Sequence, residues 1–411
     1  MKNEDDRPAL ARAVAVEPAK FAEAYWGRAP LLTRAEDLAG PAGFTDLLSP
    51  AAVDELLSER GLRTPFLRIA DQGKVLPATA FTGGGGAGAE ISDQVIDDKV
   101  MRLYAQGATL VLQGLHRIWP PLIDYASRLG EELRQPLQVN AYLTPAGNKG
   151  FATHYDTHDV FVLQVDGTKR WRIHEPVLPD PLERQTWGGR ADEVGATADG
   201  PAALDVVLEP GDALYLPRGW LHSAAAQGSS SLHLTFGVRA LTRYALVEEL
   251  MQLAAEDERL RATLPFGLDV ADAGALEPEL TETVSALRDW LLTADPAAVA
   301  ARLRERAWPA KRPAPIKPLA QLAFAEKLSP GDRIVVREGL RWQLGPDGPD
   351  HVMLRLTGRT LRFPAYCEKA VRTALDGTAH LVAHLPGLDD DEDRLVLARR
   401  LLREALAVPM L

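Results

Sequence analysis

Apolar side chains recur at helical spacing early in the chain and alternate with polar ones further on. In residues 1–90, apolar positions follow Pro18 at helical intervals, and start and stop residues indicate a second helix between Ser49 and Gly61. Residues 91–240 begin with helices and then change to about seven or eight short strands bounded by turn residues. That spacing is typical of a β-sandwich or barrel, so we expect a mostly helical N-terminal cap followed by a barrel.

The remaining chain divides into two predicted parts, which gives an α+β protein overall. Residues 241–312 carry apolar stripes at helical spacing with no strand between them, and these stripes must be buried on the barrel or on a second copy of the chain. A proline-rich stretch, Trp308–Pro318, leads into residues 313–411, where helices and short strands suggest a winged-helix-like domain. This domain lacks a dense basic helix, so we expect it to pack against protein rather than bind DNA.

The stretch Gly150–Trp171 holds the densest candidate chemistry. It predicts two strands around a tight turn at Asp166-Gly167. Side chains two residues apart share one face of a strand, so His154, Asp156 and His158 are expected to point the same way. One imidazole and one carboxylate on that face can contact the same ion.

His222 supplies the distant partner that this pair needs. It follows the turn residues of EPGDALYLPRGWLH, at the predicted start of a strand. Two imidazoles and one carboxylate make the facial triad of non-haem Fe(II), whereas structural zinc needs four ligands, often cysteines, and Cys367 is the single cysteine. We therefore expect a metal on His154, Asp156 and His222. His158 stays open as a replacement ligand, an additional ligand or a group beside the substrate.

Five further polar residues have less certain surroundings. Lys169 is predicted to begin the returning strand, where its ammonium either pairs with an anion such as a dicarboxylate or lies solvated. Asn140 and Tyr142 belong to the polar face of QVNAYLT, which either lines a cavity or faces water. We expect His233 to be a hydrogen-bonded barrel residue and His174 to be exposed and without a role.

Composition narrows the partners and the compartment. The net charge of −11 argues against non-specific nucleic-acid binding and suits either plain solubility or a basic partner. A single cysteine excludes an intrachain disulfide, the first residues lack the apolar segment of a signal peptide, and no apolar run is long enough to span a bilayer. We expect a cytoplasmic protein that does not associate with a membrane.

The sequence resembles the JmjC-type ribosomal oxygenases, the cupin-fold branch of the 2-oxoglutarate-dependent protein hydroxylases. The similar segments are FAEAYWGRAPLL, NAYLTPAG, THYDTHDVFVLQVDGTKRW, LEPGDALYLPRGWLH and LHLTF. The resemblance implies a double-stranded β-helix preceded by a mixed cap, followed by a helical dimerisation segment and a winged-helix-like domain. It also implies a homodimer.

Carried over residue by residue, the resemblance implies a cofactor site and a reaction. Fe(II) and 2-oxoglutarate would be held by a set of seven residues: His154, Asp156 and His222 on the metal, and Lys169, Asn140, Tyr142 and Thr235 around the cosubstrate. The implied reaction hydroxylates a side-chain carbon of a His or Arg in a ribosomal protein and releases succinate and CO2. A basic ribosomal protein suits an acidic enzyme. His158 and Gly237 depart from the pattern of the family, which leaves the substrate open.

Three other functions compete with this one. A cupin metalloprotein that does not use 2-oxoglutarate would share the triad but would not need Lys169. A non-catalytic interaction protein would use its helical and winged-helix-like parts. A lysine demethylase would need a pocket for a methylated ammonium, which the sequence does not identify.

Overall fold

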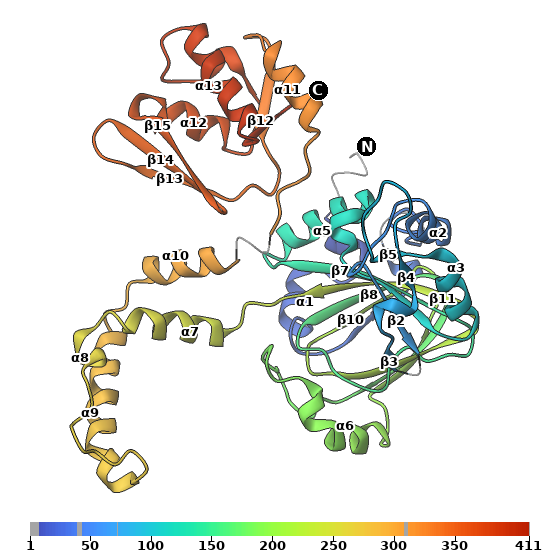
Figure 1. Ribbon diagram of the computed structural model, residues 1–411. Coiled ribbons are helices and arrows are strands. Elements are labelled where there is room, and N and C mark those ends of the chain that lie inside the picture. Colours follow the sequence, from blue (N-terminus) through green and yellow to red (C-terminus); the bar gives the residue numbers. More distant parts are fainter. Residues whose placement is uncertain (1–7, 39–42, 72, 308–310, 411) are drawn as a thin grey trace. The chain divides into compact units, whose positions relative to one another are not determined.

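The computed structural model describes residues 8–38, 43–71, 73–307 and 311–410 (Figure 1). The first seven residues of the predicted cap and part of the proline-rich stretch lie outside the described residues. The chain divides into two compact units, Met1–Ala240 and Leu241–Leu411. Within the described residues, no helix has both the length and the apolar character needed to cross a bilayer.

A nine-stranded antiparallel sheet forms the centre of the first unit (Figure 1). Its strand order is β1-β10-β8-β11-β7-β6-β2-β3, and β9 pairs with β8. The strands are β1 (Leu31–Thr33), β2 (Leu67–Asp71), β3 (Lys74–Val75), β6 (Thr109–Leu112), β7 (Leu137–Thr144), β8 (Asp159–His174), β9 (Leu204–Leu208), β10 (Ala213–Leu216) and β11 (Leu221–Val238). A separate two-stranded sheet pairs β4 (Thr82–Gly83) with β5 (Gln94–Val95).

The two longest strands, β8 and β11, give the sheet its barrel character. They pair antiparallel along almost their whole length. The first half of β8 also pairs with β10, and its second half pairs with β9. Each half of β8 thus has its own pair of neighbours, as expected where long strands bend from one sheet of a barrel into the other.

The predicted tight turn at Asp166-Gly167 is wrong, because the chain bends there and does not reverse. β8 runs through both residues, and its register with β11 shifts at the same point, between Gln227 and His233. Gly167 has a φ of +62°, and a Cβ on it would lie 1.9 Å from the carbonyl oxygen of Ser230. A glycine with this backbone conformation inside a strand marks a β-bulge as readily as a turn.

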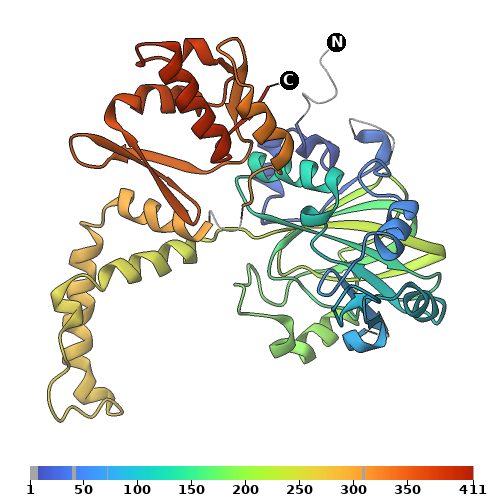
Figure 2. The ribbon, with the colours of Figure 1, turned by 45° about the horizontal axis from the view of Figure 1, so that its top comes forward.

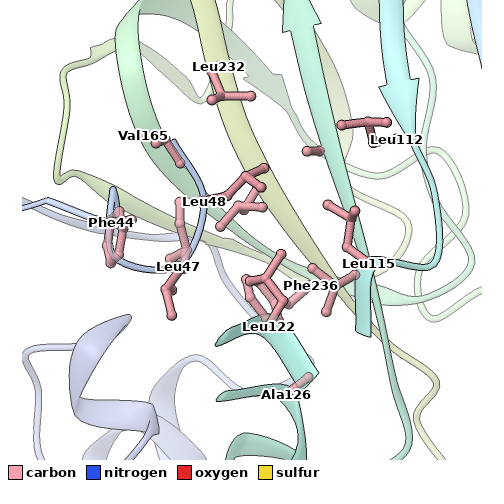
Figure 3. Close-up of a cluster of buried hydrophobic side chains, with 14 of the residues drawn as sticks. Phe44, Leu47, Leu48, Leu112, Leu115, Leu122, Ala126, Val165, Leu232 and Phe236 are labelled. Carbon is pink, nitrogen blue, oxygen red and sulfur yellow. The ribbon is translucent and has the colours of Figure 1, made fainter. Parts of the chain in front are cut away.

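Helices of the N-terminal half cover the sheet. As predicted, helices begin at Pro18 and Pro50, and the side chain of Ser49 caps the second one by accepting from the N–H of Ala52 at 3.1 Å. Figure 3 shows Leu122 lying beside Phe236 of β11 in the buried core. The helices are α1 (Pro18–Ala24), α2 (Pro50–Ser58), α3 (Asp97–Ala105), α4 (Leu115–Ile118), α5 (Pro120–Glu132) and α6 (Ala191–Ala198). The last of them lies between β8 and β9.

The second unit begins with four helices. α7 and α10 lie side by side (Figure 2), joined by ion pairs from Arg302 to Glu249 at 2.9 Å and from Arg306 to Glu248 at 2.7 Å. Several apolar side chains of this helical segment are exposed; among them are Leu246, Val247, Met251, Leu280, Val284 and Leu292. The helices are α7 (Arg243–Ala254), α8 (Glu258–Arg261), α9 (Ala273–Leu291) and α10 (Pro296–Ala307).

The end of the chain has its own hydrophobic core, built from three helices and two small antiparallel sheets. The sheets have the orders β16-β12-β17 and β13-β14-β15. The helices are α11 (Pro318–Glu326), α12 (Glu368–Ala374) and α13 (Asp391–Arg403). The strands are β12 (Arg333–Val336), β13 (Trp342–Pro346), β14 (His351–Leu356), β15 (Arg359–Pro364), β16 (His380–Leu381) and β17 (Ala407–Pro409).

Candidate metal and cosubstrate site

His154 and His222 are brought together by their own backbones. The N–H of His222 donates to the carbonyl of His154 at 2.8 Å, and the N–H of His154 donates back to His222 at 3.2 Å. His222 belongs to β11, whereas His154 lies in the segment before β8. This single bridge places the two imidazole centroids 4.4 Å apart.

Both imidazoles present the same nitrogen to Asp156. The Nδ1 atoms of His154 and His222 lie 2.8 Å from the carbonyl of Ala152 and 3.1 Å from that of Trp220. Since a carbonyl only accepts, each Nδ1 carries the proton and each Nε2 keeps a free lone pair. One ligand atom from each of the three residues lies within 4.8 Å of the others, and His222 Nε2 is 3.8 Å from Asp156 Oδ2.

The ionisation states of these groups favour a cation. Burial lowers the pKa of His222 to about 4, which keeps its imidazole neutral at pH 7. Burial by itself raises the pKa of Asp156, but the neighbouring His222, His158 and His154 outweigh it and hold that pKa below the ordinary value. Two imidazoles and one carboxylate that converge in this way fit a divalent first-row metal.

The structure corrects the expected placement of these residues along one strand. β8 begins only at Asp159, so Asp156 and His158 lie in the irregular segment before it. The N–H of Gly219 donates to the backbone carbonyl of Asp156 at 3.0 Å and holds this segment against the turn before β11. The His158 side chain lies outside the three-residue cluster, with Nε2 3.0 Å from the amide nitrogen of Gln138.

Lys169 lines the same cavity, of about 250 Å3, as the three clustered residues. It is 2% exposed, and its ammonium donates to Thr144 Oγ1 at 3.1 Å. Burial lowers its pKa from 10.5 to about 7. Within the described ranges, no carboxylate lies close enough to form an ion pair with this side chain. Lys169 is therefore a buried cation without an anionic partner, which is costly unless a ligand supplies the anion.

Two of the three other expected cosubstrate residues line this cavity as well. Tyr142 and Thr235 do so, and burial raises the pKa of Tyr142 to about 12, so its hydroxyl stays protonated. Asn140 lies behind them, along a neighbouring cavity. Its side chain hydrogen-bonds Tyr142 and accepts from the N–H of Gly114 at 3.2 Å, so it can orient the tyrosine hydroxyl.

Two aromatic residues complete the cavity and correct a prediction. His233 stacks on Tyr142, with centroids 5.0 Å apart and planes at 5°, and meets the edge of Trp171 at 5.4 Å. The Nδ1 of His233 and the indole nitrogen of Trp171 are both buried without a hydrogen-bond partner. The prediction that His233 is hydrogen-bonded is therefore wrong for its Nδ1. The sequence signal was available, because His233 shares a strand face with Thr235. His174, expected to be exposed, is only 2% exposed.

Arg68 of β2 is a site residue that the sequence did not single out. Its guanidinium lies 5.6 Å from the ring centroid of Phe151, and its Nε is buried without a hydrogen-bond partner. The side chain lines both the cavity of Lys169 and the neighbouring cavity. The short pattern FLRIA gives no indication of this role, because β2 joins the site only through the tertiary order of the sheet.

The sequence is similar to a known domain family and to known proteins. The family model described as "JmjC domain" matches residues 122–246. The bifunctional lysine-specific demethylase and histidyl-hydroxylase NO66 of Drosophila persimilis is 29% identical over 67% of this chain and 39% of its own length. Ribosomal oxygenase 1 of Gallus gallus is 29% identical over 65% of this chain and 44% of its own length. This chain thus spans about two fifths of the length of the two relatives.

Solved structures extend the similarity to the fold. YcfD, a ribosomal oxygenase from Escherichia coli, in complex with cobalt and 2-oxoglutarate, has a TM-score of 0.51 and 18% identity, covering 97% of this chain and 99% of that one. The expected cupin-type fold with mixed helix and sheet content is therefore confirmed. Residues 122–246 of this chain thus match the JmjC domain model, and the chain is similar in sequence to ribosomal oxygenase 1 and in fold to YcfD.

Proposed function

We propose that this protein is an Fe(II)- and 2-oxoglutarate-dependent oxygenase that hydroxylates a side-chain carbon of a ribosomal protein. The observation that carries the proposal is Lys169. A buried ammonium without an anionic partner shares one small cavity with a two-histidine, one-carboxylate cluster. A dicarboxylate that reaches from the metal to the lysine satisfies both ends of the cavity.

Each residue then has a defined task. His154, Asp156 and His222 would hold Fe(II), which would supply oxygen activation coupled to the decarboxylation of 2-oxoglutarate to succinate. Lys169 binds the far carboxylate, and the hydroxyls of Tyr142 and Thr235 flank it.

The apolar walls of the cavity have a separate task. Val160, Val162 and Leu216 line it and keep water away from the charged groups. In such a water-poor setting, the attraction between the ammonium and a carboxylate is stronger than it would be in bulk water.

The substrate proposal rests on relatives and charge. Two similar proteins are named as a ribosomal oxygenase and a histidyl-hydroxylase, which supports a His or Arg side chain of a ribosomal protein as the target. The net charge of −11 favours a basic protein partner over nucleic acid.

The proposed architecture has four parts: residues 1–90 as the cap, 91–240 as the catalytic barrel, 241–312 as a dimerisation segment and 313–411 as a winged-helix-like packing domain. The exposed apolar side chains of α7 and α9, with Val284 56% exposed, support burial of this segment in a homodimer. The three helices and two small sheets of residues 313–411 support the proposal that this part is a winged-helix-like domain.

The direct test incubates the Fe(II)-loaded full chain with 2-oxoglutarate and ribosomal protein fragments. Succinate should form together with a peptide heavier by one oxygen atom. Lys169→Ala should weaken 2-oxoglutarate binding without loss of metal, and His222→Ala should lose the metal. Lys99→Ala is the matched control, because that lysine hydrogen-bonds the carbonyl of Thr82 outside the cavity.

Two results would overturn the proposal. A metal-loaded protein that binds no 2-oxoglutarate would point to another cupin metalloprotein. A protein that binds neither metal nor cosubstrate would point to a non-catalytic interaction protein.

A further inference from the structure

A second cavity, of about 390 Å3, adjoins the one that holds Lys169. Four residues line both cavities: Arg68, Tyr142, Asp156 and Thr235. Asp156 also belongs to the metal cluster. A side chain that enters the second cavity therefore lies beside the metal position, while the first cavity remains free for the cosubstrate.

The second cavity is polar, and its charges are unbalanced. Gln138 and His158 form a pair across it at 3.0 Å, and the Nδ1 of His158 is buried without a hydrogen-bond partner. Arg68 brings a permanent positive charge. Asp156 is the single carboxylate among the described lining residues, and it is committed to the metal cluster.

We infer that this second cavity is the chamber for the substrate side chain, and that Arg68 with the Gln138–His158 pair selects histidine over cationic residues. The inference deepens the proposed function and rests on it. A guanidinium or a methylated ammonium would enter beside Arg68 and find no free carboxylate, a strongly unfavourable arrangement in a buried site. A neutral imidazole brings no charge against Arg68, and its ring donor and acceptor suit the polar side chains of Gln138 and His158 that line the cavity.

Gly237 keeps the chamber open. A Cβ at this position would lie 3.1 Å from Gln138 side-chain atoms and 3.1 Å from His158 Nε2. A larger side chain would therefore separate the pair and fill the space between them. The glycine, which departs from the family pattern in the sequence, is explained by this close approach.

The test uses three peptide libraries with a fixed central residue, histidine, arginine or trimethyl-lysine, and randomised flanks. Retention on the immobilised full chain reads binding, and succinate with oxygen incorporation reads turnover. An acidic protein retains basic peptides non-specifically. Specific retention is therefore measured as the difference in retention between the wild type and Gly237→Val. We expect the specific retention of the histidine library to exceed that of the other two at least tenfold.

Arg68→Gln tests the charge directly. It should shift the specific retention toward the arginine library at least fivefold, whereas Arg102→Gln, the same charge change at an exposed position of α3, should not. Specific retention of arginine or trimethyl-lysine equal to that of histidine overturns the selectivity. Retention that Gly237→Val leaves unchanged overturns the chamber.

The two proposals fail in different ways. Specific histidine retention without any 2-oxoglutarate turnover supports the chamber and refutes the proposed oxygenase. Turnover of the arginine library alone supports the oxygenase and refutes the selectivity. Loss of 2-oxoglutarate binding in Arg68→Gln, with peptide retention unchanged, assigns Arg68 to the cosubstrate and overturns its role in selection.

Discussion

Replacing Lys169 with methionine should stabilise the protein while abolishing its proposed cosubstrate binding. Methionine has a similar length and no charge, so it can occupy the same buried space. The wild-type lysine is desolvated and meets a hydroxyl, Thr144, but no carboxylate within the described structure. Its charge therefore destabilises the metal-free fold, and the benefit of that charge appears only when an anion is bound.

The magnitude follows from the pKa of Lys169. Its lowering from 10.5 to about 7 corresponds to an upper limit of about 5 kcal/mol, at roughly 1.4 kcal/mol per factor of ten in the protonation equilibrium. Loss of the hydrogen bond to Thr144 offsets about 1 kcal/mol of this. After further allowance for local relaxation, we expect Lys169→Met to raise the free energy of unfolding by about 2 to 4 kcal/mol at pH 7.

The dependence on pH gives a second, independent signature. Between pH 7 and 10.5 the lysine is mostly neutral in the folded protein but still protonated in the unfolded chain. The unfolded chain then binds more protons, so the wild type gains stability as the pH rises and its difference from Lys169→Met closes. Below pH 7 the difference should be constant.

Urea denaturation of the metal-free protein, followed by tryptophan fluorescence from pH 6 to 10, measures both effects. Lys20→Met, at an exposed position of α1, is the control and should change the unfolding free energy by less than about 0.5 kcal/mol. If Lys169→Met is no more stable than the wild type at pH 7, the lysine already has an anionic partner within the protein, and the reasoning about its role fails.

Three further outcomes are expected. The affinity of the metal-loaded protein for 2-oxoglutarate, measured by calorimetry, should be constant below pH 7 and fall up to tenfold per pH unit above it. Binding needs the charged form of Lys169, and the pKa of this residue in the ligand-free protein is about 7. An affinity that stays constant between pH 7 and 9 would contradict this. Gly167→Ala should destabilise by more than about 2 kcal/mol in denaturation, since its Cβ would meet a backbone carbonyl at 1.9 Å, whereas Gly188→Ala, with open space around it, should be neutral. Tyr215→Phe removes a 2.8 Å hydrogen bond to the buried carboxylate of Asp159 and should cost about 2 to 3 kcal/mol in the same assay; an unchanged midpoint would show that water replaces the hydroxyl.

The sequence predicted which three residues cluster but not how the backbone brings them together. Residue type and spacing were enough to select His154, Asp156 and His222, because few arrangements of imidazole and carboxylate serve one ion. The expected shared strand failed, since β8 begins only at Asp159. If a short segment is a strand, alternation of its side chains indicates which of them share a face. The same pattern does not indicate whether the segment pairs with a neighbouring strand.

The errors have a common cause in long-range contacts. The turn expected at Gly167 is a bend, because β11 pairs with both halves of β8, and local turn residues carry no information about that distant partner. Arg68 enters the site from β2 for the same reason. The second cavity could not be predicted either, since Gln138, His158 and Gly237 come from three separate segments that only the folded sheet brings together.

The single backbone bridge between His154 and His222 also sets when the protein can hold a metal during its synthesis. A chain that has emerged only through β8 contains His154 and Asp156 but not the strand that carries His222. Even a complete chain lacks the site until β11 has paired with β8 and its first residues have met the segment before β8. The proposed metal, if it needs all three ligands, therefore binds only after the barrel closes, and an unfinished or unfolded chain does not hold it.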